Sequence, residues 1–483
     1  MARKLMFWTA IATTMAIAAV ACQSPPDDLS EFEQPIQTRE QLRIGVLMPE
    51  SGSLATVGQP LMNALVLVRD RVNACGGVNQ APVALVTAET RSYPPVEADA
   101  MMRLVRGAQV HGAIAILSND GTPRLISIAN RNRVPLLSPT NANAPLVDDG
   151  EIFDGYWSRT VLSYQQEAIA LAEMAIARGF DAIATVVSDT PDGIQFERAF
   201  TRRFEQLGGT VVNPDSPIRY EFQPFASEAE DARLPFGFGG EPFADDGADD
   251  ADGAQGGTAD PAAAQLFDRP PAAIAIFLDN RAGIDRVRAI ANQGPAADVQ
   301  WIVARTPTLV KMLKDEQFQI HSTPSESEAA QADNRHVLTG ALGLSPRPKR
   351  EAFQVLVQAW QSRFDEPMGA FVPQAWDAAT LLMLAAEAGR DNDGKAIRSQ
   401  LQAVANPPGM PVTEVCQGLE YLRNGESIDY QGASGALNLD SWGNVMGVTE
   451  FDLWQVTETG DQEIIDQITR LPAVGGTSIG GDD

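Results

Sequence analysis

Few side chains in this sequence stand at spacings that support catalysis or metal binding. The three histidines are His111, His321 and His336, and none has a histidine or cysteine neighbour at metal-ligand spacing. No Gly-x-Ser-x-Gly elbow stands between a predicted strand and a helix, and no Gly-x-x-x-x-Gly-Lys loop continues into Ser or Thr. Ser434, between two glycines, has the spacing of a turn. We therefore expect no enzyme activity, no metal and no cofactor.

One cluster of carboxylates lies in residues 236–265, a segment rich in Gly, Ala and Asp. Its members are Asp245, Asp246, Asp249, Asp250 and Asp252. Closely spaced acids can hold Ca²⁺, but a calcium loop also needs a late bidentate acid, and none stands at that spacing. We interpret the segment as a solvated acidic insertion and keep the calcium loop as the alternative.

The N-terminal residues have the pattern of an export signal. Arg3 and Lys4 precede an apolar stretch, residues 5–20, which is short for a spanning helix. The stretch ends in Ala19-Val-Ala-Cys22, which resembles a bacterial lipobox. We predict a signal peptide over residues 1–22, a lipid on Cys22, and a periplasmic or cell-surface location on a bacterial membrane. A plain signal peptide and an uncleaved anchor are the alternatives. Residues 23–40, acidic and Pro-rich, are expected to form a tether, and residues 471–483 a disordered tail.

Size, charge and cysteine content narrow the class of protein further. A chain of 483 residues with 44% hydrophobic residues suits two lobes of ordinary size. The formal net charge of -27 argues against nucleic-acid binding, which needs a basic face. Cys75 and Cys416 remain beside Cys22. In an oxidising compartment they form a disulfide if they meet in the fold, and otherwise they are separate buried thiols.

Short apolar strands alternate with amphipathic helices along the chain. A helix runs from Leu61 to the stop at Gly76-Gly77, and another spans residues 196–207. The expected strands are residues 43–48, 83–87, 113–117, 134–137, 182–187, 210–212, 273–278, 300–303 and 337–341. This alternation predicts an α/β protein with parallel sheets covered on both faces.

Several longer motifs occur in the order found in one known family. They are Ile44–Gly52 with Gly58, Val72–Asn79, Val134–Pro139, Ser158-Arg-Thr160, Val372–Ala378 and Tyr430–Gly443. From about Leu42 to about Val456 the chain therefore resembles the type I periplasmic binding proteins of branched-chain amino-acid ABC transporters. The resemblance implies two doubly wound parallel-sheet lobes joined by three crossovers. Lobe 1 would comprise residues 41–160 and 341–440, and lobe 2 residues 161–340 and 441–470.

The resemblance also implies a ligand pocket at the carboxyl ends of the strands. In the family a Ser pair and a Ser-Pro-x-Ala-Thr loop hold the ligand's carboxylate. The matching positions are Ser118, Asn119, Thr140, Asn141 and Ala142 in lobe 1, and Asp192, Asn280 and Arg305 across the cleft. The family's acid that neutralises the ligand's ammonium falls near Arg305, which would repel an α-amino acid. Asp192 or Asp279 is the alternative partner.

The function implied by the resemblance is capture of an amino acid, or a related small amide or acid, for an ABC importer. The implied partners are the ligand, the permease and ATPase subunits, and the membrane through the lipid, with the protein itself a monomer. The alternative is a lipoprotein that uses the same fold to sense a solute or to regulate envelope enzymes.

Overall fold

The computed structural model describes residues 41–51, 55–116, 121–143, 155–213, 218–220, 271–278, 299–304, 338–448 and 450–470, with residues 283, 286, 287, 290 and 336. Within this part the strands form two large sheets and two small two-stranded ones. The expected signal peptide, tether, acidic insertion and tail lie outside the described residues, as does Cys22.

The first sheet is entirely parallel, with the strand order β2-β1-β3-β4-β5. Its strands are β1 (Leu42–Met48), β2 (Val83–Glu89), β3 (Gly112–Ala115), β4 (Leu136–Ser138) and β5 (Trp157–Arg159). Strands β3 and β4 are fully buried, and β1 is buried except at Arg43, because helices cover both faces of the sheet.

The second sheet has the order β17-β16-β11-β10-β9-β6-β7, with β8 paired to β6. Its strands are β6 (Ala182–Ser188), β7 (Thr210–Val211), β8 (Ile218–Tyr220), β9 (Ala273–Ile276), β10 (Gln300–Val303), β11 (Leu342–Pro346), β16 (Glu450–Val456) and β17 (Gln462–Thr469). Strands β6 to β11 pair in parallel, whereas β16 and β17 are antiparallel additions.

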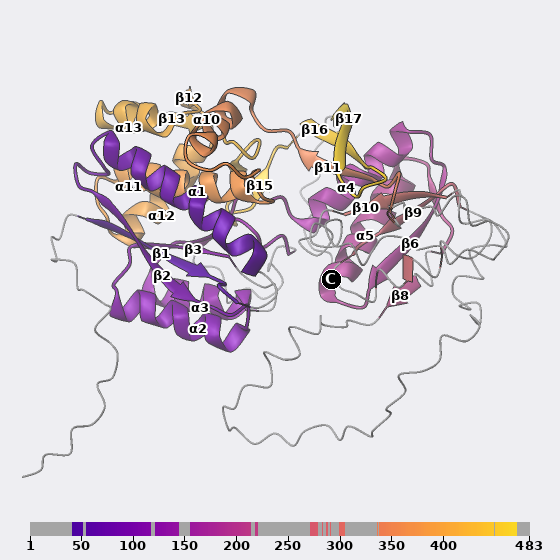
Figure 1. Ribbon diagram of the computed structural model, residues 1–483, viewed down its shortest axis with the longest axis horizontal. Helices are drawn as coiled ribbons and strands as arrows, with labels where there is room; N and C mark the ends of the chain where they lie inside the picture. The colour runs from indigo at the N-terminus through magenta and orange to yellow at the C-terminus, as the bar shows by residue number, and fades with distance from the viewer. Residues whose placement is uncertain are drawn as a thin grey trace, which may run out of the picture. The chain divides into compact units, whose positions relative to one another are not determined.

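Helices cover both faces of the first sheet (Figure 1). In Figure 1, α2 and α3 lie on one face and α1 and α11 on the other. The helices are α1 (Ala55–Ala74), α2 (Pro94–Met102) with the π-helical turn η1 (Arg103–Gly107), α3 (Thr122–Asn132), α4 (Tyr164–Ala177), α5 (Pro191–Gln206), α10 (Arg350–Gln361), α11 (Val372–Gly389), α12 (Gly394–Ala405) and α13 (Val415–Arg423). Helix α11 is buried along almost its whole length, which explains its apolar character all round.

Four short strands complete the described elements. They are β12 (Met410–Val412), β13 (Ile428–Tyr430), β14 (Asn438–Leu439) and β15 (Val445–Met446). Strand β12 pairs in parallel with β13, and β14 forms a small antiparallel hairpin with β15.

Local signals in the sequence explain where several elements begin and end. Helix α1 stops before Gly76 and Gly77, which adopt φ values of +98° and +75°. A Cβ on Gly77 would lie 1.9 Å from the carbonyl oxygen of Ala81, so only glycine fits there. The strand expected at residues 337–341 is instead a turn over residues 338–340, and β11 begins at Leu342. The apolar run correctly indicated burial, but Gly340 with φ +85° places it in a turn.

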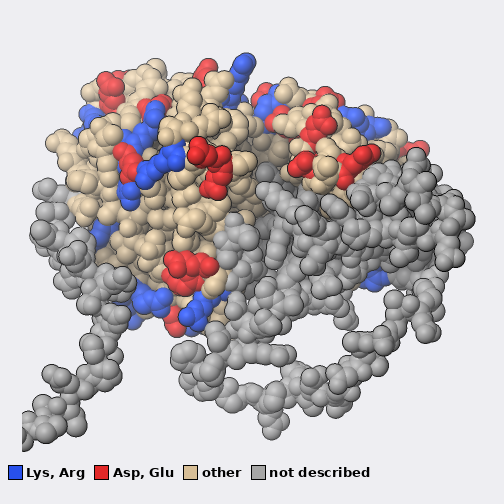
Figure 2. Space-filling model, in the orientation of Figure 1, with Lys and Arg blue, Asp and Glu red and all other residues tan. Residues whose placement is uncertain are grey.

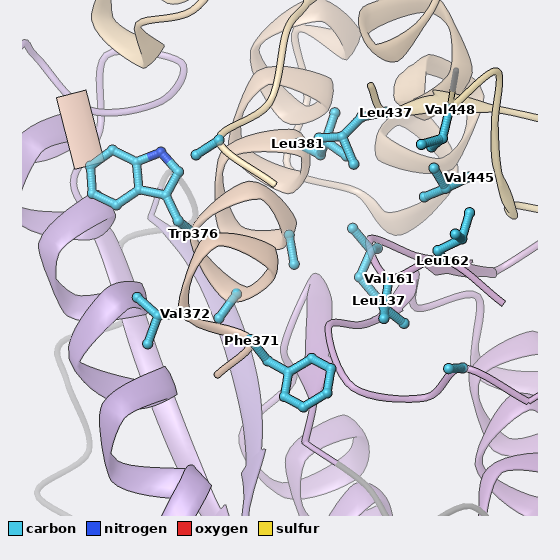
Figure 3. Packing of buried hydrophobic residues seen from close by; sticks show 14 of the residues in the cluster. Leu137, Val161, Leu162, Phe371, Val372, Trp376, Leu381, Leu437, Val445 and Val448 are labelled. Carbon is cyan, nitrogen blue, oxygen red and sulfur yellow. The ribbon is translucent and has the colours of Figure 1, made fainter. Parts of the chain in front are cut away.

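The chain passes between the elements of the two sheets three times: from β5 to α4, from β11 to α10, and from β15 to β16. Three passages match the number expected from the sequence. Figure 3 shows buried apolar side chains near the first and third of them, with Leu137 of β4 beside Val161 and with Leu162 beside Val445. Burial of Val161, Leu162 and Val448 provides apolar packing at these two passages.

A disulfide joins Cys75, just after α1, to Cys416 in α13, with their Cα atoms 5.9 Å apart. The sequence left open whether these cysteines form a disulfide or remain two separate buried thiols, and the structure shows the disulfide. None of the helices among the described residues is both long and apolar enough to cross a bilayer.

Candidate functional site

The loop after β4 lies at the carboxyl edge of the first sheet. Ser138, the last residue of β4, is fully buried and donates its hydroxyl to the carbonyl oxygen of Ala115 (2.9 Å). The same Ser138 oxygen accepts a hydrogen bond from the backbone N–H of Asn141 (3.0 Å). The side-chain amide of Asn141 donates to the hydroxyl of Thr122, the first residue of α3 (2.6 Å). The loop is therefore held rigidly, as a binding loop requires.

Three of the residues expected to bind ligand belong to this loop. Thr140, Asn141 and Ala142 are each less than 5% exposed. Because the amide of Asn141 is already bonded to Thr122, the observed role of this side chain is to anchor the loop. These three residues therefore lie together in one buried loop, and their contact with a ligand stays a prediction.

Arg159 ends β5, directly beside Ser138 in the sheet register. Its side chain is among the largest fully buried ones of the protein, although it carries a charge. Its Nη1 donates to the carbonyl oxygens of Asn141 (3.3 Å) and Asn143, so one edge of the guanidinium braces the binding loop. Its Nε–H is buried and has no hydrogen-bond acceptor among the described residues.

Arg159 is a fully buried arginine with a lowered pKa. Burial lowers the pKa of the Arg159 guanidinium to about 10, while the nearby carboxylates of Asp440 and Asp192 act in the opposite direction. The group is still a cation at neutral pH. A buried cation with an unsatisfied donor is costly unless a partner arrives, so this residue is a strong candidate for a functional group.

Asp192 stands in the first turn of α5. The hydroxyl of Thr190 caps this helix by accepting a hydrogen bond from the N–H of Gly193 (3.1 Å). An acid at this position favours the helix because the helix dipole is positive at the N-terminus. The carboxylate of Asp192 also raises the pKa of Arg159. Asp192, a residue predicted from the sequence, therefore interacts with the arginine that contacts the loop after β4.

A second buried charge joins α11 to the segment after β13. Asp377 is fully buried and accepts four hydrogen bonds. The donors are the Tyr430 hydroxyl (2.7 Å), the N–H of Ala433 (2.9 Å), and the N–H (2.7 Å) and hydroxyl (2.6 Å) of Ser434. Burial raises the pKa of the Asp377 carboxyl to about 6, and the hydrogen bonds partly oppose this rise. This network links the motif Val372–Ala378, which contains Asp377, to the motif Tyr430–Gly443, which contains the donors.

The remaining predicted ligand residues fall elsewhere in the chain. Ser118, Asn119, Asn280 and Arg305 lie outside the described residues, as does Asp279. Sequence reasoning missed Arg159 and Asp377 as individual residues, although both stand inside motifs that it had identified. A charged residue at the end of an apolar strand was the available signal for Arg159.

No group of three or more His, Cys, Asp or Glu among the described residues is arranged to hold a metal ion. On the face shown in Figure 2, Lys and Arg side chains are scattered among Asp and Glu, and the described part of that face carries no continuous basic surface.

Comparisons with known proteins agree with the resemblance found in the sequence. The family model described as "Periplasmic binding protein" matches residues 41–246. A comparison with curated protein sequences finds no match. The family model thus supports the resemblance over the first half of the described chain.

Solved structures resemble the chain over most of its length. A putative branched-chain amino acid ABC transporter protein from Rhodospirillum rubrum is 19% identical, with 88% of this chain and 99% of that chain covered and a TM-score of 0.56. The leucine binding protein of Thermotoga maritima is 17% identical, with 89% and 99% covered and a TM-score of 0.59. A solute binding protein from R. palustris in complex with benzoate is 16% identical, with 89% and 97% covered and a TM-score of 0.58. At these identities the likeness establishes the fold.

Proposed function

Since this chain has the type I periplasmic binding protein fold, we propose that it is an extracytoplasmic solute-binding protein that captures a small molecule for an ABC importer. The solute would be an amino acid or a related small amide or acid. The observation that carries the proposal is the rigid loop of residues 138–142 at the carboxyl edge of a parallel sheet, with a buried cation beside it. Ligands of open α/β sheets bind at this edge.

Relatives support the class of ligand. Solved relatives were crystallised in complex with leucine, isoleucine, benzoate and 4-hydroxybenzoate. All these molecules carry a carboxylate on a small apolar body. These relatives are named as solute- or substrate-binding proteins, and we accordingly propose binding without chemistry.

The proposal also includes export and anchoring. The segment ending at Cys22 would deliver the mature protein to the extracytoplasmic side of a bacterial membrane and attach it there through a lipid. The tether of residues 23–40 would then give the two lobes room to reach the permease and its ATPase. The lobes would comprise residues 41–160 with 341–440, and residues 161–340 with 441–470, with two changes. Strand β11 pairs in the second sheet and so belongs to the second lobe, and β15 pairs with β14 and so belongs to the first.

A sensing or envelope-regulating lipoprotein is the second candidate. The observation that favours it is the sequence at the family's ammonium site, where Arg305 stands in place of an acid. Under that reading the fold would bind a solute or a partner protein without handing it to a permease. Deleting the gene distinguishes the two candidate functions. Solute uptake should be lost if the protein serves an importer and should be unchanged if it is a sensor or regulator.

The direct test is a thermal-shift screen of the mature protein with amino acids, amides, urea-like compounds and small acids. A ligand at 100 times its Kd stabilises the folded state by about 2.7 kcal/mol, which gives a clear rise in Tm. Asn119→Ala should weaken a hit about ten-fold or more, because a charge-assisted hydrogen bond contributes about 1.5–3 kcal/mol. Arg305→Glu should improve binding of an α-amino acid if the ammonium site can be restored. Unchanged affinity in both variants would place the ligand elsewhere.

A further inference from the structure

Four exposed arginines gather where two helices on one face of the first sheet end (Figure 1). Arg103 and Arg106 stand in η1, and Arg131 and Arg133 stand at the end of α3. The other sides of these helices pack with β3 and β4 in one apolar cluster, so the arginines lie on the outer side of the layer. No ion pair within the described part of the chain involves any of the four.

This group of arginines is unusual in so acidic a protein. Residues 91–133 contain six arginines and three acids, whereas the whole chain has a formal net charge of -27. One of the three acids, Glu97, is fully buried. The C-terminus of a helix attracts cations, but it carries only about half a negative charge, so two helix ends account for about one of the four arginines. The remaining positive charge is available to a partner.

The nearest acids outside these helices come from the segment before α12. Burial and the nearby Arg43 lower the pKa of His111, which lies between η1 and β3, and Asp391 and Asp393 oppose this shift. These two acids therefore lie close to the end of η1. Residues 390–395 contain two basic residues beside the two acids, so the segment is neutral in sum and leaves the charge of the four arginines uncancelled.

The chain enters the fold at the same edge of the sheet. The segment after η1 leads into β3 at Gly112, and Arg43, the second residue of β1, donates its Nη2–H to the carbonyl oxygen of Gln109 between them (2.8 Å). The proposed lipid on Cys22 would be joined to this edge through the eighteen residues 23–40. A flexible linker of that length has a root-mean-square span of about 20–25 Å. An anchor at Cys22 would therefore keep this edge close to the bilayer.

We propose that Arg103, Arg106, Arg131 and Arg133 form a docking surface for the anionic headgroups of a lipid bilayer. Guanidinium groups match phosphate oxygens in charge and geometry, and each arginine near an anionic membrane contributes about five-fold in affinity. The acidic remainder of the protein has little influence at this surface, because the Debye length is about 8 Å at physiological ionic strength.

Docking of this kind would orient the protein. Four arginines together contribute roughly several hundred-fold in affinity, which is too little for stable anchoring, so the surface would orient a protein that a lipid holds. The loop of residues 138–142 lies at the opposite, carboxyl edge of the same sheet and would face away from the bilayer. The docking surface rests on the proposed anchor for its orientation, but it does not depend on which solute is captured.

Co-sedimentation with lipid vesicles tests the proposal. One set contains equal parts of phosphatidylglycerol and phosphatidylcholine, and the other contains phosphatidylcholine alone. The protein is the mature chain with Cys22→Ser, so that no acyl chain contributes to binding. At about 0.1 M salt the anionic vesicles should bind it about a hundred-fold more tightly or better, and in about 1 M salt, where the Debye length is about 3 Å, the preference should vanish. The double variant Arg103→Gln with Arg106→Gln should bind the anionic vesicles about thirty-fold more weakly.

Arg198→Gln with Arg202→Gln is the matched control, because it removes two exposed arginines one helical turn apart from α5. The control should bind as the wild-type protein does, and an equal loss in both double variants overturns the proposal. Equal binding of the wild-type protein to anionic and neutral vesicles overturns it too, whether or not the variants fold. A solute found in the thermal-shift screen without a preference for anionic vesicles contradicts only the docking surface. Preference for anionic vesicles without any solute contradicts only the solute-binding function.

Discussion

The buried carboxyl of Asp377 makes the stability of the protein depend on pH in a direction opposite to that of most carboxylates. Its pKa is about 6 in the folded protein, whereas the ordinary pKa of an aspartate, which we take for the unfolded chain, is 3.8. Between these values the folded state binds more protons than the unfolded state, so the free energy of unfolding falls as pH rises. The contribution is fully present below the unfolded pKa and is lost as pH passes through the folded one.

The size of the effect follows from the two pKa values. A shift of one pKa unit is 1.36 kcal/mol, so the full change is about 3 kcal/mol, of which about 2 kcal/mol falls between pH 4 and pH 7. Asp377→Asn removes the titration while keeping the shape of the side chain. The stability advantage of the wild-type protein over Asp377→Asn should therefore shrink by about 2 kcal/mol from pH 4 to pH 7.

Urea unfolding of both proteins at pH 4, 5, 6 and 7 measures this difference and cancels the titration of all other groups. Asp466→Asn, which makes the same substitution at an exposed acid, is the matched control. An advantage that grows with pH would refute the reasoning. It would mean that the hydrogen bonds from Tyr430, Ala433 and Ser434 outweigh burial and lower the pKa of Asp377.

Three further predictions concern the anchor, the disulfide and one turn. Cys22→Ser should release the protein from membranes in cell fractionation, and a variant that stays membrane-bound contradicts the lipobox assignment. Reducing the Cys75–Cys416 bond, which closes a separation of 341 residues, should lower the free energy of unfolding by about 2–5 kcal/mol, measured in urea with and without reductant. Gly77→Ala should lower Tm by several degrees, because its Cβ would clash with the Ala81 carbonyl oxygen; Gly179→Ala has a similar φ but open space and should cost less.

Much of the two parallel sheets could be predicted from sequence because their central strands are short, buried and mostly apolar. The predicted strand at residues 300–303 coincides with β10, and the glycine stop after α1 stands where it was expected. Strand β17 escaped prediction because nearly all its residues are exposed, so they show no alternation of apolar and polar types. The apolar run around Leu338 was wrongly predicted to be a strand, because a buried turn can be as apolar as a strand.

Of the candidate site, the sequence predicted only the loops. The motifs located residues 138–142 and 158–160, and the structure places both at one edge of the first sheet. The unsatisfied Nε of Arg159 depends on which carbonyl oxygens surround it in space, and no spacing along the chain encodes that. The same holds for Asp377, whose donors lie more than 50 positions further along the chain.

Calorimetric titration of the mature wild-type protein with the acids that pass the thermal-shift screen is the decisive experiment on solute binding. We expect saturable binding of at least one small carboxylic acid, with one site per chain. A folded protein that binds none of the acids, amides and amino acids in the screen would contradict the assignment as a solute-binding protein.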